Sequence, residues 1–293
     1  MERVGAQVTK FAPGDRVILT PAAAADNGPF GEADVLDRNL SGSRSDGSSP
    51  LRCNIERVAG NFFGQSSLAS HALVTERNAV KIDDDVPFPI LAPLGGDVRT
   101  GAGTVINALR PRPGSAIAIF GAGAVGLSAV MAARLCGCHP IIAIDIKASR
   151  LQLAETFGAT HTIDPDGLDP VDAIRAISRN GAEFSVETTG LPEVTRQAVD
   201  CLNQGGVCAL AGIAASDAEA TLNLNQLRVG RTVRGSLFGD SVPAFFIPRL
   251  VEFYCQGRLP ADRIITEYGF DNINQAADDI LSGAAVKPVL IMP

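Results

Sequence analysis

Between residues 98 and 240, short hydrophobic runs alternate with helix-length segments. The hydrophobic runs predict strands at residues 117–120, 141–144, 182–187, 207–211 and 233–239. The segments between them predict helices at residues 124–136, 149–157 and 193–202. Strands that alternate with helices of this length are typical of a parallel, doubly wound sheet. We therefore predict an α/β fold for this part of the chain.

The regions on either side have a different pattern. A Pro-Gly-Asp turn at 13–15 leads into a β-branched run, and short strands are predicted at 72–74 and 80–82. Residues 21–55 are rich in Ala, Gly, Ser, Asp and Pro, which predicts a long loop. The tail predicts two helices and a closing strand, at residues 243–254, 273–281 and 289–291.

One uncharged, mostly apolar run at residues 115–133 approaches the length of a membrane span. Three glycines interrupt it, and a β-branched part is followed by an Ala/Leu part. A buried strand followed by a buried helix has the same hydropathy, so we expect no membrane segment. The N-terminal residues contain an early acid and no apolar core, and they do not resemble a signal peptide.

Residues 121–126 read Gly-Ala-Gly-Ala-Val-Gly and match the Gly-x-Gly-x-x-Gly pattern of dinucleotide-binding turns. The match follows a predicted strand and opens a predicted helix. In such a turn Gly121 makes the tight bend, Gly123 admits the pyrophosphate, and Gly126 lets helix and strand pack closely. Ala124 and Val125 begin the helix, whose N-terminal N–H groups suit phosphate oxygens.

An acidic residue follows this pattern at the required distance. Asp145 ends the second predicted strand, 19 residues after Gly126. Its carboxylate is suited to the adenosine ribose hydroxyls and would repel a 2′-phosphate, which predicts NAD rather than NADP. Arg150, on the next predicted helix, is placed to reach the adenosine side.

Composition narrows the possible partners. The chain has 293 residues. Its formal net charge of −7 and its isoelectric point of about 5.0 disfavour binding to nucleic acid and to anionic membranes. It contains no Trp and two Tyr, so a base-stacking surface is not expected. Its six cysteines in a chain this long do not suggest a disulfide framework, and we expect reduced thiols in a cytoplasmic protein.

An ordered set of motifs resembles the zinc-type medium-chain alcohol dehydrogenase family. The motifs are Val-Gly-Ala-Gln-Val-Thr at 4–9, Pro-Gly-Asp-Arg-Val at 13–17, Gly-Ala-Gly at 101–103, the glycine pattern at 121–126 and Glu-Thr-Thr-Gly at 187–190. The segments at 62–69, 92–95, 270–276 and 287–288 are most similar to the aryl-alcohol (benzyl-alcohol) branch. The resemblance covers nearly the whole chain.

The resemblance implies a Rossmann domain inserted in a partial GroES-like β domain. The NAD-binding domain would span residues 98–240, and the truncated GroES-like domain residues 1–97 and 241–293. It further implies NAD contacts at Thr100, Asp145, Arg150, Ala211 and Ile213, with backbone contacts near Leu237 to the nicotinamide amide. The family pairs Rossmann domains edge to edge, which predicts a homo-oligomer through the sheet edge near 233–238.

The zinc sites of the family are not matched. Two ligands of the catalytic zinc lie in a region that precedes the first residue here, and Gly96 stands at the position of the third, a Cys. The stretch at 20–34, which corresponds to the four cysteines of the structural zinc, contains none. Asp97 would be a single ligand, whereas a catalytic zinc needs about three. We therefore expect no zinc.

Other metal-ligating residue types occur, but their positions do not suggest a site. Cys136, Cys138 and His139 follow a helix that runs back along the sheet, about 20 Å from the expected nicotinamide position. His71 and His161 have no ligand-type neighbours in the sequence. A buried structural role is the simpler interpretation of Cys136, Cys138 and His139.

Two functions remain open. The first is an NAD-dependent, alcohol-dehydrogenase-like oxidoreductase, with a small alcohol or aldehyde, possibly aryl, as substrate. The second is a non-catalytic NAD-binding protein or partner subunit, because no residue replaces zinc as the group that polarises the alcohol oxygen. The catalytic residues are not identified from the sequence.

Overall fold

The computed structural model describes residues 1–21, 42, 48–49, 51–54, 56–65 and 68–293. Its contacts divide the chain into two compact units. The first unit comprises Met1–Gly96, Val242–Glu252 and Ile265–Pro293, and the second comprises Asp97–Ser241 and Phe253–Ile264. The assignment of the sequence to a GroES-like and an NAD-binding domain stays a prediction, and each unit is described by itself.

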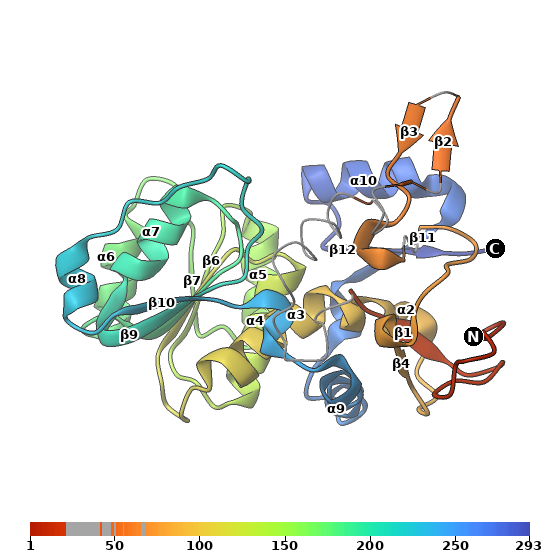
Figure 1. The fold of residues 1–293 in the computed structure, drawn as a ribbon. Helices are drawn as coiled ribbons and strands as arrows, with labels where there is room; N and C mark the ends of the chain where they lie inside the picture. Colours follow the sequence, from red (N-terminus) through yellow and green to blue (C-terminus); the bar gives the residue numbers. More distant parts are fainter. Residues whose placement is uncertain (22–41, 43–47, 50, 55, 66–67) are drawn as a thin grey trace. The chain divides into compact units, whose positions relative to one another are not determined.

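The second unit contains a six-stranded parallel sheet, which confirms the predicted fold class (Figure 1). Its strand order is β10-β9-β8-β5-β6-β7. The strands are β5 (Ile117–Phe120), β6 (Ile141–Ile144), β7 (His161–Ile163), β8 (Ala182–Glu187), β9 (Leu202–Leu210) and β10 (Thr232–Gly235). The chain builds outward from β5 to β7, then returns to β8 on the other side of β5. The connection that leaves β5 and the connection that leaves β8 therefore run toward opposite sides of the sheet.

Helices flank this sheet on both faces. They are α3 (Asp97–Gly103), α4 (Ala124–Leu135), α5 (Ala148–Phe157), α6 (Pro170–Ser178), α7 (Pro192–Asp200) and α8 (Leu224–Arg228), and α3 continues as a π-helix over Thr104–Leu109. Asp169 begins α6, because its carboxylate accepts a hydrogen bond from the Val171 N–H at 2.8 Å. Gly158, with φ of 118°, ends α5.

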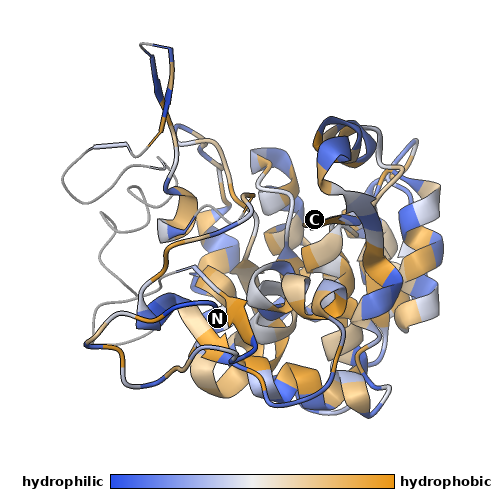
Figure 2. Ribbon diagram, turned by 90° about the vertical axis from the view of Figure 1, so that its right-hand side faces the viewer, coloured by the Kyte–Doolittle hydropathy of each residue, from blue (hydrophilic) through white to orange (hydrophobic). Residues whose placement is uncertain are grey.

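A hydrophobic core lies between the sheet and helices α6 and α7. Its residues are buried and come from alternate positions of the central strands and from the inner faces of both helices. They include Ala118, Phe120, Ile142, Ile144, Ile174, Ala198, Val199 and Cys208. Hydrophilic and hydrophobic residues alternate along the helices in Figure 2, as expected for helices that bury one face.

The structure corrects several predicted boundaries in this unit. The helix predicted at 193–202 ends at Asp200, and the buried Leu202 already begins β9. The strand predicted at 233–239 ends at Gly235, because Phe238, Gly239 and Asp240 adopt positive φ values that no strand allows. Strand β7 and helices α3 and α6 were not predicted.

The first unit consists of small sheets and helices. Strand β1 (Val17–Leu19) pairs antiparallel with β4 (Ala79–Lys81), and β2 (Leu51–Cys53) pairs antiparallel with β3 (Glu56–Val58). Strand β11 (Ile265–Gly269) runs parallel to β12 (Lys287–Ile291). The helices are α2 (Phe88–Leu91), α9 (Pro243–Cys255), whose last three residues belong to the second unit, and α10 (Ile273–Ser282).

Two predictions for the first unit have different outcomes. The strand predicted at 72–74 is wrong, since these residues form no strand and Leu73 is 92% exposed. The loop predicted at 21–55 lies mostly outside the described residues.

In the part of the chain that is described, no helix is long and apolar enough to cross a membrane. The apolar run at 115–133 forms β5 and most of α4 instead.

The cysteines differ strongly in burial. Cys138, Cys201 and Cys208 are buried, whereas Cys53 and Cys255 are exposed. Burial raises the pKa of the Cys208 thiol to about 12 and likewise raises the pKa of Cys201. These two thiols therefore pack as small apolar side chains.

Truncation of the core behind the sheet tests this packing. Ile142→Ala removes a fully buried side chain from β6, and we expect it to lower the free energy of unfolding by about 2–5 kcal/mol. Leu224→Ala on α8 is the control, because Leu224 is 77% exposed and should change stability by less than about 0.5 kcal/mol. Urea unfolding followed by circular dichroism measures both, and equal effects would contradict the described core.

Candidate functional site

A cavity of about 500 Å³ lies at the carboxyl ends of β5, β6 and β8 in the second unit. Its walls come from the turns that follow these strands, from the segment after β7, and from α3, α4, α5 and α7. The lining includes Asp97, Gly121, Gly123, Ala124, Val125, Asp145, Ile146, Lys147, Arg150, Pro165, Thr188, Thr189, Leu191, Val194 and Gln197. Open parallel sheets place ligand sites at this edge, where neighbouring connections diverge.

The glycine turn after β5 forms one wall of the cavity. Gly121 has φ of 90°, and its N–H donates to the Ile144 carbonyl at 2.8 Å. A Cβ on Gly126 would lie 1.8 Å from the Gly121 carbonyl oxygen, so only glycine permits this approach of helix and strand. A Cβ on Gly123 would meet no atom closer than Arg150 Nη1 at 3.7 Å. The wall at Gly123 is therefore open to a ligand.

Asp145 and Arg150 lie at the adjacent wall. The Asp145 carboxylate accepts the Ala122 N–H at 2.7 Å and the Lys147 N–H at 2.8 Å, which orders both turns around it. Arg150 is 8% exposed and donates to the Ala122 carbonyl at 3.4 Å. Burial lowers the pKa of Arg150, whereas the Asp145 charge acts to raise it. A carboxylate and a cation are thus held at one end of the cavity.

Glu187, at the end of β8, organises the opposite side. Its carboxylate is 1% exposed and accepts N–H groups of Thr189 and Gly190, the latter at 3.0 Å. Its carbonyl accepts the N–H groups of Ala211 and Gly212 at 2.8 and 3.0 Å. One buried residue therefore joins the turns that follow β8 and β9, which is a positioning role.

Comparisons with known proteins agree with this geometry. The family model described as zinc-binding dehydrogenase matches residues 124–253. A geraniol dehydrogenase from Castellaniella defragrans is 42% identical over 301 residues, which cover 99% of this chain and 80% of the relative. The crystal structure of benzyl alcohol dehydrogenase from Acinetobacter calcoaceticus superposes with a TM-score of 0.92 at 41% identity and covers 100% and 81% of the two chains. The crystal structure of an alcohol dehydrogenase zinc-binding domain protein from Burkholderia ambifaria superposes with a TM-score of 0.90 at 44% identity. It covers 100% of this chain and 81% of that protein.

The chain belongs to the zinc-binding medium-chain alcohol dehydrogenase family. The resemblance found in the sequence is thereby confirmed, including its similarity to benzyl alcohol dehydrogenase. The similarity to a geraniol dehydrogenase was not predicted. The chain is homologous to alcohol dehydrogenases along about 80% of the length of these relatives. Members of this family are oxidoreductases that use a nicotinamide cofactor.

The fit of zinc to this family member can be tested on the described residues. Among them, no group of three or more His, Cys, Asp or Glu residues gathers as metal ligands. Gly96 has no side chain that could serve as a ligand. The stretch at 20–34 lies mostly outside the described residues. The described part of the chain thus does not fit a zinc ion.

The structure brings six of the eleven predicted cofactor residues together at the cavity. They are Gly121, Gly123, Ala124, Val125, Asp145 and Arg150. Gly126 lies behind the turn against Gly121. Four residues do not line the cavity. Ala211 and Ile213 follow β9, Leu237 follows β10, and Thr100 lies in α3, where its carbonyl accepts the Thr104 hydroxyl at 2.8 Å.

Several lining residues were missed by sequence reasoning. Ile146 and Lys147 follow Asp145 directly, and the position of the acid at a strand end could have indicated them. Thr188 belongs to the Glu-Thr-Thr-Gly motif, and its hydroxyl donates to the Phe120 carbonyl at 2.8 Å. Leu191, Val194 and Gln197 come from α7 and its approach, and no local pattern pointed to them.

A pair of glycine substitutions separates folding from ligand access. Gly126→Ala forces a Cβ against backbone, so we expect it to lower the free energy of unfolding by about 1–3 kcal/mol or more. Gly123→Ala is its matched counterpart, since it should fold normally but weaken NADH binding by about tenfold, or ~1.4 kcal/mol. Thermal unfolding and calorimetric titration of both variants measure this. A destabilised Gly123→Ala would contradict the open wall.

Proposed function

We propose that the second unit binds NAD in this cavity. The observation that carries the proposal is the glycine turn of residues 121–126 held against Asp145, because it joins an open wall, a helix N-terminus and a carboxylate at one strand edge. The N–H groups at the start of α4 face the pyrophosphate. Asp145 accepts the ribose hydroxyls, and Arg150 and Ile146 flank the adenosine.

The same residues favour NAD over NADP. A 2′-phosphate on the adenosine ribose would meet the Asp145 carboxylate, which is a like charge at a site already hydrogen-bonded to Ala122 and Lys147. Lys147 and Arg150 line the same cavity, and their positive charges would attract a 2′-phosphate. Asp145 is therefore the residue that decides the preference for NAD.

The nicotinamide half extends across the divergence of the connections toward β8, β9 and β10. Thr100, Ala211, Ile213 and the backbone near Leu237 are the proposed contacts on this side. NAD supplies a hydride acceptor, and the chain binds and orients it. The proposed substrate is a small alcohol, oxidised to its aldehyde, with aryl alcohols suggested by the benzyl alcohol dehydrogenase relative. Since the described residues do not fit zinc, no step through a metal is derived.

A second candidate function is supported by residue 96. Gly96 stands where the family places a zinc ligand, and the described residues hold no alternative ligand group. An NAD-binding partner subunit without its own catalysis fits these observations. The exposed edge at β10 would join it to a second copy or to an active homologue, because β10 has a sheet neighbour on one side. A cytoplasmic location remains an expectation.

The first test is NADH formation from benzyl alcohol and simple alkanols with NAD, with and without added zinc. We expect NADH binding, seen as enhanced cofactor fluorescence, in either case. Turnover above the rate of the reaction mixture without protein supports the oxidoreductase, and the dependence of the turnover rate on zinc reports whether a metal contributes. Binding without turnover supports the partner subunit. A folded protein that binds no NADH overturns both.

Cofactor preference tests the role of Asp145. Asp145→Asn removes the charge with little change of shape, and we expect the ratio of NADH to NADPH affinity to fall by about tenfold, or ~1.4 kcal/mol. Asp172→Asn on α6 is the matched control, because its side chain is 78% exposed and lies outside the cavity. Titration calorimetry with both cofactors measures the ratio, and an unchanged ratio in Asp145→Asn would contradict the assignment.

A further inference from the structure

The turn that follows β10 is placed at the nicotinamide side of the proposed site. All six strands are parallel, so the carboxyl ends of β8, β9 and β10 share the edge at which the glycine turn follows β5. Asp145 follows β6, on one side of β5, and a dinucleotide that crosses the divergence reaches the strands on the other side. The turn Leu237–Asp240 is thus available to the end of the cofactor remote from adenosine.

This turn has an unfavourable backbone conformation. Phe238, Gly239 and Asp240 have φ values of 48°, 70° and 46°, which gives three consecutive left-handed residues. Two of them carry a Cβ, and such residues rarely adopt this region. Conformations of this kind persist where surrounding contacts hold them, and they concentrate at functional sites.

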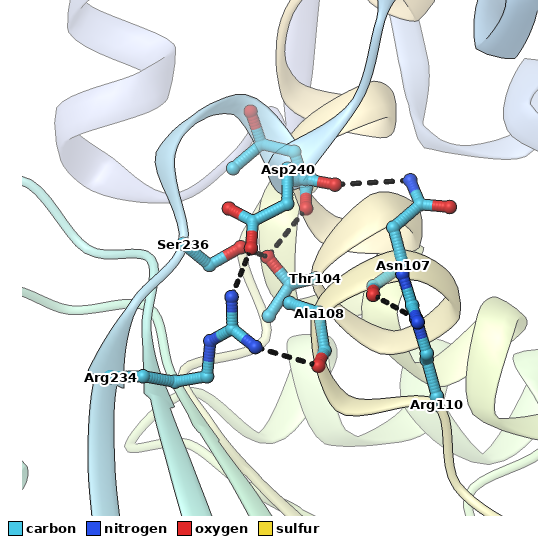
Figure 3. A network of polar contacts seen from close by, with 9 residues as sticks. Thr104, Asn107, Ala108, Arg110, Arg234, Ser236 and Asp240 are labelled. Carbon is cyan, nitrogen blue, oxygen red and sulfur yellow. Dashed lines mark hydrogen bonds and ion pairs between the residues drawn. The ribbon is translucent and has the colours of Figure 1, made fainter. Parts of the chain in front are cut away.

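The holding contacts come from one helix and one ion pair (Figure 3). Arg234 donates to the Ala108 carbonyl at 3.1 Å, and its other terminal nitrogen pairs with the Asp240 carboxylate. On the far side of the turn, Asn107 Nδ2 donates to the Gly239 carbonyl at 3.1 Å. The hydroxyls of Thr104 and Ser236 lie 2.8 Å apart. The π-helix thus contacts the turn and the strand end that precedes it.

Close backbone packing adds to these polar contacts. A Cβ on Gly103 would lie 2.5 Å from the Gly239 carbonyl oxygen, and a Cβ on Gly239 would lie 2.7 Å from the Gly103 Cα. The Arg99 guanidinium lies 4.9 Å from the centre of the Phe238 ring. The turn therefore sits against α3 with little freedom to shift.

The ion pair is not explained by stability alone. The Asp240 side chain is 9% exposed, whereas that of Arg234 is 39% exposed. Burial raises the pKa of Asp240, although the Arg234 and Arg110 charges and the Leu237 N–H act to lower it. Burying a carboxylate costs desolvation, which the attraction to its partner often fails to recover. In some proteins such a contact is retained for the geometry that it specifies.

We propose that the Arg234–Asp240 ion pair holds the left-handed turn Leu237–Asp240 in the conformation that receives the nicotinamide end of the cofactor. Arg234 and Asp240 are then positioning residues, because they act through the backbone of the turn. The inference rests on the proposed NAD site, and it adds that the adenosine and nicotinamide halves depend on separate groups of residues.

The experiment compares NADH with ADP-ribose, which keeps the adenosine and pyrophosphate but lacks nicotinamide. Titration calorimetry is run on the full chain and on Asp240→Asn, which keeps the shape of the side chain and removes its charge. We expect the dissociation constant of NADH to rise about tenfold, and that of ADP-ribose to change by less than about twofold. A merely structural role would weaken both ligands together.

Two further variants keep the result interpretable. Asp240→Gly removes the same carboxylate from a position where glycine adopts φ of 46° freely, so it should fold and show the same selective loss of NADH affinity. Asp200→Asn breaks the Arg196–Asp200 pair on α7, whose atoms lie 3.4 Å apart, and should change neither affinity. The inference is overturned if the Asp240 variants lose affinity for NADH and ADP-ribose to the same extent, or if neither variant loses affinity for NADH. An unmodified chain that binds neither ligand overturns the proposed NAD site as well.

Discussion

The approach of Gly126 to the Gly121 carbonyl is the contact on which the cavity depends. It sets the distance between the end of β5 and the first turn of α4, and thereby directs the helix N-terminus toward the strand edge. Thr188, which follows the neighbouring strand β8, stabilises this approach, because its hydroxyl donates to the carbonyls of Phe120 and Gly121. The Asp145 carboxylate then closes around the Ala122 N–H.

The two halves of the cofactor site are built in different ways. The adenosine side uses residues close in sequence, since Asp145, Lys147 and Arg150 belong to one strand end and the following helix. The other side joins residues more than a hundred positions apart, such as Asn107 with Gly239 and Arg234 with Ala108. Local contacts form wherever the strand and helix form, whereas the distant ones need the complete second unit.

This difference explains what could be predicted from the sequence. The glycine turn and Asp145 follow a spacing pattern, and β5, β6 and β8 were predicted with their observed limits. Residues 237–239 were mistaken for the end of a strand because Leu237 and Phe238 are apolar, whereas tertiary contacts with the π-helix determine the backbone of this turn. Leu202 was assigned to a helix for a similar reason, since burial in the sheet outweighs its helical preference. The cavity residues on α7 depend on packing that no local pattern encodes.

The contrast among the cysteines has a practical consequence. Thiols with a raised pKa inside the core react slowly with alkylating reagents, whereas the exposed Cys53 and Cys255 are accessible to them. Cys53 belongs to the first unit and Cys255 to the second. Each unit therefore carries an exposed thiol, and the two offer attachment points for a donor and an acceptor dye once the partly exposed Cys136 is replaced. Energy transfer between these dyes would measure the distance between the two units, with and without the cofactor.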